Sequence, residues 1–555
     1  MIHFIIIVLF LGALSASDFQ PSKSDLNSAL RMNGNYKVWV FFEDKELNKK
    51  SLNFMLNEVS NKLHYKTKKR RSKVRSSSMV DIRDIPVSRE NIEEIQSTGA
   101  IICMESKWLN AVSISASFEQ ISAMSNLFCV KNIIPVRRGK RKIPNQSHRN
   151  FKLNRTTQID YGESHDQLDQ INVIDAHSSG YTGQGIRILI LDTGYLKDHE
   201  AIPNDQIVGE WDFVNNDGET QNEDGDPVTQ HKHGTQTLSI LGGRIEGTLY
   251  GSAYESEFLL GKTEDESQEN PIEEDWYVAG LEWGEENGAE IVSSSLGYID
   301  WYSQEDLNGT TAIITLAVNT AIENGMVVVT AVGNSGSDGI VAPADAFNVI
   351  ACGAVNLEGN IAPYSSNGPT SDGRIKPEVC ARGVNTFCAG VSNTSAYGYE
   401  NGTSFSTPLV AGAVACILQA HPDWTPEQIR EALLETASNS NSPDNQYGWG
   451  IINVEEAIDY TFSNNNSPMN YSISNIFPNP FNHTTHFSVN VYQTSNITLK
   501  IFDIYGREIE IVWSGVKENR EYQFHWNANG LASGIFFVNL QGANGSITKK
   551  MCLLK

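Results

Sequence analysis

The sequence contains few cysteines, and beyond its first residues it has no long hydrophobic run. Seven cysteines are spread over 555 residues, and none forms a Cys-x-x-Cys pair or a cluster with histidine. This scarcity excludes a disulfide-dense small scaffold and gives no indication of a structural zinc site. After residue 17 no segment stays apolar over the roughly 20 residues that a membrane-spanning helix needs, so we expect no such helix.

The first 17 residues, MIHFIIIVLFLGALSAS, form an apolar run that ends in small residues. A run of about 13 apolar residues is shorter than a spanning helix and is typical of a secretory signal peptide. Its head lacks lysine and arginine and has only His3. A buried N-terminal strand is the alternative, but a free apolar N-terminus fits it poorly, so we expect a signal peptide and an extracellular location.

The cysteines leave one question open. Cys352 and Cys416 lie in apolar runs and are predicted to be buried thiols. Cys380 and Cys388 are close in sequence and could form a disulfide outside the cell, or remain free.

Positive charge is scarce in the middle of the chain. The net charge of −24 combines +11 over residues 18–150, −37 over 151–472 and +2 over 473–555. The opposite charges predict that the first segment binds the second within one precursor, although an acidic surface also aids solubility. The run KTKKRRSKVR (66–75) could contact phosphates, but no aromatic or recognition-helix pattern accompanies it, so we expect no nucleic-acid partner.

Hydrophobic periodicity divides the chain into three parts. The first is predicted to be a small two-layer α+β domain with a β-α-β-β-α-β order, followed by an exposed basic linker at 137–155. Its clearest elements are strands at 36–44, 108–117 and 130–138 and helices at 88–100 and 118–127.

The second part alternates buried apolar strands with helices, which predicts an α/β fold: a parallel sheet covered by helices on both faces. The predicted strands lie in 185–194, 257–263, 289–297, 325–334 and 347–355. In such sheets the functional residues lie at the carboxyl ends of the strands. Asp192, Ser295 and Asn334 are at these positions. The third part follows an Asn/Ser-rich linker at 461–473 and has short strands with turn residues, which predicts a small β-sandwich.

Three motifs of the middle part belong together chemically. LILDTG puts Asp192 at a strand end, HGTQTLSILGG puts His233 just before a helix, and NGTSFSTP puts Ser404 at the start of an apolar helix. A serine hydroxyl needs a base within hydrogen-bond reach, and the base needs a carboxylate to fix its tautomer. Backbone N–H groups at a helix N-terminus can stabilise a developing oxyanion.

In this order the motifs resemble those of the subtilisin-like serine proteases over about residues 160–460. The resemblance implies a subtilisin-like fold in which Asp192 orients His233, His233 is general base and then acid, and Ser404 attacks the peptide carbonyl. It also implies that Asn334, in AVGNSG, and the backbone N–H of Ser404 form the oxyanion hole. The segment SSSLG would place Ser295, Leu296 and Gly297 against extended substrate.

The sequence departs from the family pattern near the base. The usual HGTHVAG is HGTQTLS here, with Gln236 in place of a second histidine. His231, two residues before the base, keeps open a metal pair with His233, but we assign it no chemistry. Family members often bind structural Ca²⁺, and the loop 215–227 has carboxylates, although its spacing is not that of an EF-hand. The acidic stretch 264–275 is either a loop that favours basic substrates or a solvated loop.

The flanking parts also have family resemblances. Residues 35–136 resemble the inhibitory propeptide of the family in position and element order. The pieces IFPNPF (476–481), KIFDIYGREI (500–509) and GLASGIFFVNLQ (530–541) resemble the C-terminal sorting domain of type IX secretion cargo, with a generic surface-binding β-sandwich as the alternative. The expected organisation is a signal peptide at 1–17, propeptide and basic linker at 18–150, catalytic domain at 151–462, linker at 463–472 and sorting domain at 473–555.

These observations predict a secreted serine endopeptidase, made as an autoinhibited precursor, that works through an acyl-enzyme. We expect a monomer that needs no cofactor for its chemistry. Its expected partners are protein or peptide substrates, its own propeptide and the secretion machinery. Three alternatives are a non-catalytic binding protein on the same fold, a metallohydrolase using His231 and His233, and an adhesin that acts through its β domain.

Overall fold

The described part of the chain falls into two units, Met1–Asp459 and Tyr460–Lys555. The computed structural model describes residues 26, 31–32, 34–75, 78–136, 159–267, 272–299 and 301–462, and 471–554 apart from 474–475, 477, 480, 493, 504–506 and 543–544. The expected signal peptide, the basic linker 137–155 and most of the linker 463–472 lie outside the described residues.

The N-terminal domain of the first unit has the predicted β-α-β-β-α-β elements around one antiparallel sheet. The elements are β1 (Arg31–Met32), β2 (Asn35–Phe42), α1 (Lys49–Lys62), α2 (Tyr65–Val74), α3 (Arg89–Ser97), β3 (Ile101–Ser106), β4 (Ala111–Ala116), α4 (Phe118–Met124) and β5 (Val130–Pro135). The sheet order is β1-β2-β4-β3, and β5 pairs with β2. Sequence periodicity missed α1 and α2, which are inserted between β2 and α3.

The next domain is built on a seven-stranded parallel sheet in the order β14-β13-β12-β11-β6-β10-β7. The strands are β6 (Arg187–Asp192), β7 (Ile207–Asp212), β10 (Glu257–Lys262), β11 (Ile291–Ser294), β12 (Val327–Ala331), β13 (Ile350–Val355) and β14 (Val379–Arg382). Five of them were predicted, and their residues are almost entirely buried, as a sheet covered on both faces requires. The edge strands β7 and β14 were not predicted: most residues of β7 are only partly buried, and β14 is a short run, VCAR, that ends in arginine.

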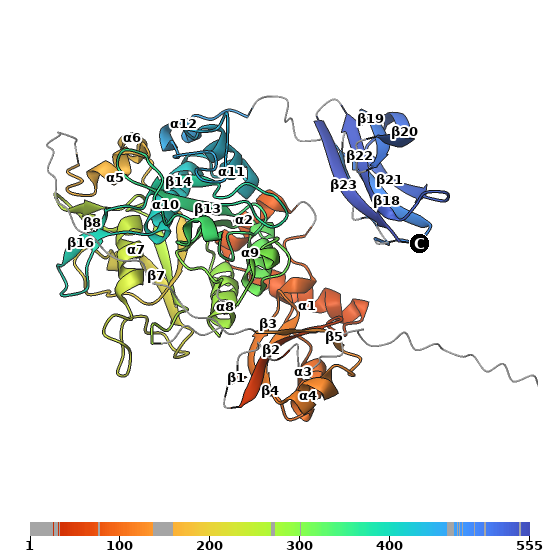
Figure 1. Ribbon diagram of the computed structural model, residues 1–555, viewed down its shortest axis with the longest axis horizontal. Helices are drawn as coiled ribbons and strands as arrows, with labels where there is room; N and C mark the ends of the chain where they lie inside the picture. Colours follow the sequence, from red (N-terminus) through yellow and green to blue (C-terminus); the bar gives the residue numbers. More distant parts are fainter. Residues whose placement is uncertain are drawn as a thin grey trace, which may run out of the picture. The chain divides into compact units, whose positions relative to one another are not determined.

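Helices cover both faces of this sheet (Figure 1). The helices α7 (Lys232–Gly242) and α10 (Thr403–Ala420) contact each other, and α10 also contacts β11 to β14. The helices α8 (Glu273–Glu286) and α9 (Ile313–Glu323) pack together and contact β6 and β12. The remaining elements of this domain are α5 (His165–Asp169), α6 (Val173–Ser178), β8 (Arg244–Ile245), β9 (Leu249–Tyr250), β15 (Thr386–Ala389), β16 (Tyr397–Glu400), α11 (Pro426–Glu435) and α12 (Val454–Ile458).

Helix α10 differs from our expectation for the apolar segments. Within the described residues it is long and apolar enough to cross a membrane by length and composition. In the structure 89% of that stretch is buried inside the protein, however, which is typical of the central helix of a folded domain.

The N-terminal domain and the sheet domain share one hydrophobic core. Trp39, Trp108 and Val136 of the first domain are buried in the same cluster as Tyr277 of α8 and Ile314 of α9. The interface between the two domains is therefore packed like a protein interior rather than like a loose contact.

The cysteine question is answered in favour of free thiols. All seven cysteines are free, so Cys380 and Cys388 do not form a disulfide. Both are buried, as are Cys352 and Cys416, and burial raises the pKa of these thiols above the ordinary value.

The second unit is a β-sandwich, as predicted. One antiparallel sheet has the order β17-β18-β21 and the other β20-β19-β22-β23. The strands are β17 (Tyr471–Ile473), β18 (Thr484–Val491), β19 (Ser495–Asp503), β20 (Glu508–Lys517), β21 (Arg520–Asn527), β22 (Gly534–Gly542) and β23 (Gly545–Leu553). Alternate residues such as Phe487, Leu499, Trp526 and Val538 form its core.

Candidate active site

Asp192 ends strand β6 at the carboxyl edge of the parallel sheet and is fully buried. Its carboxylate accepts three hydrogen bonds. Oδ1 accepts from the backbone N–H of Thr193 at 2.8 Å and faces Nδ1 of His233 at 2.7 Å, and Oδ2 accepts from the hydroxyl of Thr237 at 3.0 Å. The carboxylate is thus fixed in one orientation toward the imidazole.

His233 is the second residue of α7, whereas we predicted it just before the helix. The adjacent Gly234 lets the helix approach β6, because a Cβ there would lie 2.2 Å from the carbonyl oxygen of Gly194 and 3.2 Å from Cβ of Asp192. The short contact at His233 Nδ1 therefore depends on this glycine.

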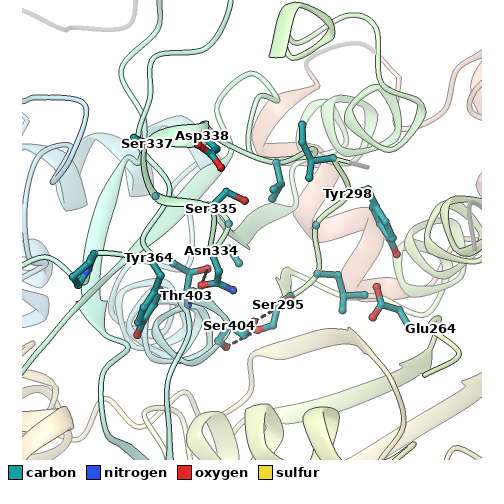
Figure 2. A pocket seen from close by; sticks show the side chains of 18 of the residues that line it. Glu264, Ser295, Tyr298, Asn334, Ser335, Ser337, Asp338, Tyr364, Thr403 and Ser404 are labelled. Atoms are coloured by element: carbon teal, nitrogen blue, oxygen red, sulfur yellow. Dashed lines mark hydrogen bonds between the residues drawn. The ribbon is translucent and has the colours of Figure 1, made fainter. Parts of the chain in front are cut away.

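Ser404 lies in the first turn of α10 and is largely buried. Its hydroxyl donates to the carbonyl of Ser295 at 3.1 Å, and the hydroxyl of Ser295 donates to the carbonyl of Ser404 at 2.7 Å (Figure 2). The backbone N–H of Ser404 has no partner inside the helix because it is one of the first four of α10. The ring of the next residue, Phe405, is centred 5.8 Å from the imidazole of His233, which places the start of α10 beside the start of α7.

Asn334 follows β12 and presents an amide to the same place. Its Oδ1 accepts from the backbone N–H of Thr403 at 2.9 Å and from the Thr403 hydroxyl at 3.1 Å. A backbone N–H can only donate, so the amide oxygen must face Thr403 and the NH₂ group is left to face the cavity. Figure 2 shows Asn334, Ser295 and Ser404 around this space.

A cavity of about 640 Å³ opens beside these groups. All three predicted substrate-binding residues, Ser295, Leu296 and Gly297, line it together with Asn334 and Ser404. Its wall also includes Glu264, Tyr298, Trp301, Asp338, Val341 and Tyr364. The cavity is large enough for a side chain of a peptide bound along residues 295–297.

Residues 264–267 of the acidic stretch 264–275 lie in a loop, as expected, but the stretch is not solvated throughout. Glu264 is buried and lines the cavity, residues 268–271 lie outside the described residues, and the stretch ends in helix α8. There Glu274 and Asp275 are buried because the N-terminal domain and neighbouring loops pack over them. Burial raises the pKa of Glu274 to about 8 although Oη of Tyr302 donates to it at 2.6 Å.

The histidine pair does not form the metal site that its spacing left open. Nδ1 of His233 faces Asp192, and Nδ1 of His231 has no hydrogen-bond partner among the described residues. Burial lowers the pKa of His231. In the part of the chain that the structure describes, the group of side chains close enough to hold a metal is Asp212, Asp217 and Glu223.

That carboxylate group does not fit a calcium ion. The ammonium group of Lys262 lies 2.7 Å from Oδ2 of Asp212 and 2.8 Å from Oδ2 of Asp226. Oδ1 of Asp212 already accepts from two backbone N–H groups, those of Val214 and Asn215. A divalent cation bound by Asp212 would meet this ammonium group, and we assign calcium no site here.

Sequence reasoning missed two residues that hold the site. Thr237 fixes the carboxylate of Asp192, and Thr403 fixes the amide of Asn334. Thr237 could have been found, because it follows His233 by four residues and so lies on the same face of the helix. Thr403 gave no such indication, since its partner is 69 residues away.

Comparisons with known proteins assign each part of the chain. Residues 183–450 match the profile of the Subtilase family, residues 37–150 that of the Peptidase S8 propeptide domain, Bacteroidota, and residues 475–553 that of the secretion system C-terminal sorting domain. These three matches correspond to the sheet domain, the N-terminal domain and the β-sandwich.

Individual relatives match the same middle part. Subtilisin from Bacillus pumilus is 35% identical over 292 residues, which are 52% of this chain and 96% of the relative. Subtilisin Savinase from Lederbergia lenta is 34% identical over 293 residues, 52% of this chain and 96% of the relative. A solved structure of a protease from Pseudoalteromonas arctica has a TM-score of 0.45 and 24% identity, and covers 55% of this chain and 99% of its own.

Proposed function

Because the chain belongs to the subtilase family of serine endopeptidases, we propose that Asp192, His233 and Ser404 are its catalytic triad. The observations that support this most are the 2.7 Å contact between Oδ1 of Asp192 and Nδ1 of His233 and the position of Ser404 in the wall of the cavity. The C-terminal sorting domain makes it a secreted or cell-surface protein.

The proposed reaction has two halves. In the first, Nε2 of His233 accepts the proton of the Ser404 hydroxyl while Oγ attacks the peptide carbonyl. Asp192 accepts from Nδ1 of His233, which fixes the tautomer and stabilises the imidazolium. The imidazolium then gives its proton to the leaving amine, and an acyl-enzyme remains on Ser404. In the second half a water molecule attacks the acyl group while His233 accepts its proton. The imidazolium then returns this proton to Oγ of Ser404 as the bond between Oγ and the acyl carbon breaks, and the acid product leaves.

The oxyanion that forms in each half has two proposed donors, Nδ2 of Asn334 and the backbone N–H of Ser404. Thr403 holds the Asn334 amide in place before substrate binds. The amide therefore needs little reorientation in the transition state, and this lowers the free-energy cost of stabilising the oxyanion. We propose that extended substrate lies along Ser295, Leu296 and Gly297, with a side chain in the adjoining cavity.

The enzyme has a propeptide domain, and we propose that this domain inhibits it in the precursor. The proposed organisation is a signal peptide at 1–17, propeptide and linker at 18–150, catalytic domain at 151–462, linker at 463–472 and sorting domain at 473–555. Recognition of the last domain by a type IX secretion machinery belongs to the same proposal. The proposed steps use only groups of the chain and one water molecule.

N-terminal sequencing of the purified chain tests this proposal, with Ser404→Ala beside the unchanged protein. We expect the unchanged chain to begin after the propeptide and Ser404→Ala to remain unprocessed. The matched control is Ser406→Ala, two residues along the same helix, whose hydroxyl donates to the carbonyl of Thr403 at 2.8 Å. Full activity on a peptide substrate in Ser404→Ala, after removal of the propeptide by an added endopeptidase, would contradict the assignment of the nucleophile.

A further inference from the structure

Helix α2 docks on the protease domain through basic side chains. Six of its ten residues, YKTKKRRSKV, are lysine or arginine. Its buried residues are Lys66, Thr67, Arg70 and Arg71, and none of them is apolar. Charged side chains are almost never fully buried unless they are paired, so the docking surface must supply the partners.

The partners come from the C-terminal ends of α8 and α9. Arg70 uses each of its three nitrogens there: Nε donates to the carbonyl of Asn324 at 3.1 Å, Nη1 to the carbonyl of Ala289, and Nη2 to the carboxylate of Glu285. The last carbonyls of a helix have no intrahelical donor, and the helix dipole makes its C-terminus attractive to cations. A guanidinium fits such a place better than an ammonium because its donors are arranged as a planar fork.

Neighbouring residues of α2 extend the contact. Nζ of Lys66 lies 3.2 Å from Oε2 of Glu290, and the hydroxyl of Thr67 donates to the carbonyl of Glu285 at 2.7 Å. Nε of Arg71 donates to the carboxylate of Glu285 at 2.8 Å. The carboxylate of Glu285 is thus shared by two guanidinium groups and is itself 1% exposed.

Asp84 of the N-terminal domain orients the second guanidinium. Nη1 and Nη2 of Arg71 donate to its two carboxylate oxygens at 2.9 and 2.6 Å. This bidentate pair fixes the side chain before it meets Glu285, so the cationic face of α2 is preorganised.

The docking surface lies at the opposite edge of the sheet from Ser404. Ala289 and Asn324 precede β11 and β12, whereas Ser295 and Asn334 follow them. Four strand residues separate the two edges by roughly 13 Å. Gly325 brings α2 close, since its φ is +88° and a Cβ there would lie 3.2 Å from Cγ of Arg70.

We propose that the protease domain has an arginine-binding site at this edge, which we call the amino-edge site: Glu285, Ala289, Glu290 and Asn324. Helix α2 is its ligand in the precursor, and the site holds the propeptide independently of the substrate cleft. The ligand class is an arginine-bearing cationic helix. On the processed enzyme the site is open to the same helix of a second propeptide.

This site gives the propeptide a second anchor. The other anchor is the contact of the propeptide sheet with α8, where Lys37 pairs with Asp275 and the Ser106 hydroxyl donates to Glu282 at 2.6 Å. Cutting the linker removes neither anchor. Release therefore requires dissociation or degradation of α2 as well, and the enzyme stays inhibited after the cut until this happens.

The test measures how fast the propeptide leaves the full chain. A recognition sequence for an added, unrelated endopeptidase is placed between residues 137 and 158 of an inactive Ser404→Ala chain, and the chain is immobilised by its C-terminus. After cutting, loss of bound mass gives the dissociation rate. We expect Arg70→Met to raise this rate about 30-fold or more, because it leaves the buried Glu285 carboxylate without one of its partners.

Matched variants separate this effect from general loss of charge. Lys69→Met removes the same charge from an exposed position of the same helix and should change the rate less than twofold. Arg70→Lys keeps the charge but loses the planar arrangement of donors, so its dissociation rate should lie between those of Arg70→Met and Lys69→Met. The dissociation rate of Glu285→Gln should match that of Arg70→Met. The double variant should dissociate only slightly faster than either single variant, because the two residues form one interaction. Equal rates for Arg70→Met and Lys69→Met would overturn the proposal.

Hydrogen exchange on the unsubstituted cut complex gives an answer even if Arg70→Met does not fold. We expect the amides of α2 to stay as protected after the cut as before it, together with those of β2. Rapid exchange of α2 while β2 stays protected would overturn the proposal. Neither experiment depends on the identity of the catalytic groups, since the chain is inactive by design and only binding is measured.

Discussion

The two edges of the parallel sheet differ in how completely their polar and charged side chains are paired. At the carboxyl edge Asp192, His233 and Asn334 are each fixed on one side by a neighbour, and a cavity of about 640 Å³ lies beside Asn334 and Ser404. At the amino edge each nitrogen of Arg70 has a protein partner, and Glu285 is shared by two guanidinium groups. The fully paired charged side chains of the amino edge hold two domains together. The polar groups of the carboxyl edge are each held by one neighbour, which leaves their other side available to a substrate.

Helix α8 connects the edges and shows the difference within one element. Its C-terminal Glu285 is paired with Arg70. The neighbours that lower the pKa of Glu274, near its N-terminus, are the uncharged side chains of Tyr302 and Trp301. Burial consequently raises the pKa of Glu274 to about 8. Within this helix, burial thus raises the pKa of a glutamate that has no cation packed beside it.

The largest effect is expected for Ser404→Ala, which removes the proposed nucleophile. We expect kcat for a peptide substrate to fall about 10⁶-fold, the effect seen when the nucleophile of a subtilisin is removed. The measurement uses chains freed of the propeptide by an added endopeptidase, with Ser406→Ala as control. A fall of less than about 100-fold would mean that another group attacks the substrate.

Asp192→Asn should give the next largest effect, about 10⁴-fold in kcat, because an amide can donate to Nδ1 of His233 and fix the wrong tautomer. The control is Asp198→Asn, an exposed carboxylate near the same edge. Steady-state kinetics at several pH values checks both. If the two variants behaved alike, Asp192 would be only a structural residue at the end of β6.

Asn334→Ala should lower kcat about 10²–10³-fold with little change in KM, because the proposed donor acts on the oxyanion rather than on bound substrate. Thr403→Val removes one of the two donors that hold the Asn334 amide but keeps the backbone N–H, so its effect should stay below about tenfold. An equal effect on kcat and KM in Asn334→Ala would indicate a role in substrate binding.

The smallest effect concerns stability and pH, through Glu274→Gln in the inactive Ser404→Ala chain. The folded-state pKa of Glu274 is raised to about 8, above its ordinary value of 4.5. Its contribution to stability is therefore full below pH 4.5 and is lost as the pH rises through 8. We expect the variant to gain Tm relative to the parent chain between pH 5 and pH 9, measured by calorimetry. A difference in Tm that does not change with pH would contradict the buried, neutral state of Glu274.

The sequence predicted the carboxyl edge well, for physical reasons. Buried parallel strands have continuous apolar runs, so the polar residues that follow them stand out, as Asp192 and Asn334 do. The proposed nucleophile at a helix start and the proposed base beside a glycine add two further local features. These residues are recognisable because each must meet a local requirement of the backbone as well as a chemical one.

The amino edge could not be predicted in the same way. Helix α2 has no apolar face, so its periodicity gives no indication of burial, and its run of lysine and arginine suggested only a contact with phosphates. The partner of Arg70, Glu285, is 215 residues away in the chain. Likewise the stretch 264–275 was interpreted as a loop, because its acidic composition does not reveal that α8 begins there under the N-terminal domain.

Labelling of the processed enzyme with a serine-directed fluorophosphonate tests the central claim most directly. The labelled residue is identified by mass spectrometry, with Ser404→Ala and Arg70→Met as companion chains. The account predicts one label, on Ser404, which is absent in Ser404→Ala and kept in Arg70→Met once its propeptide has been removed. A label on another residue, or equal labelling of Ser404→Ala, would contradict the assignment of chemistry to the carboxyl edge.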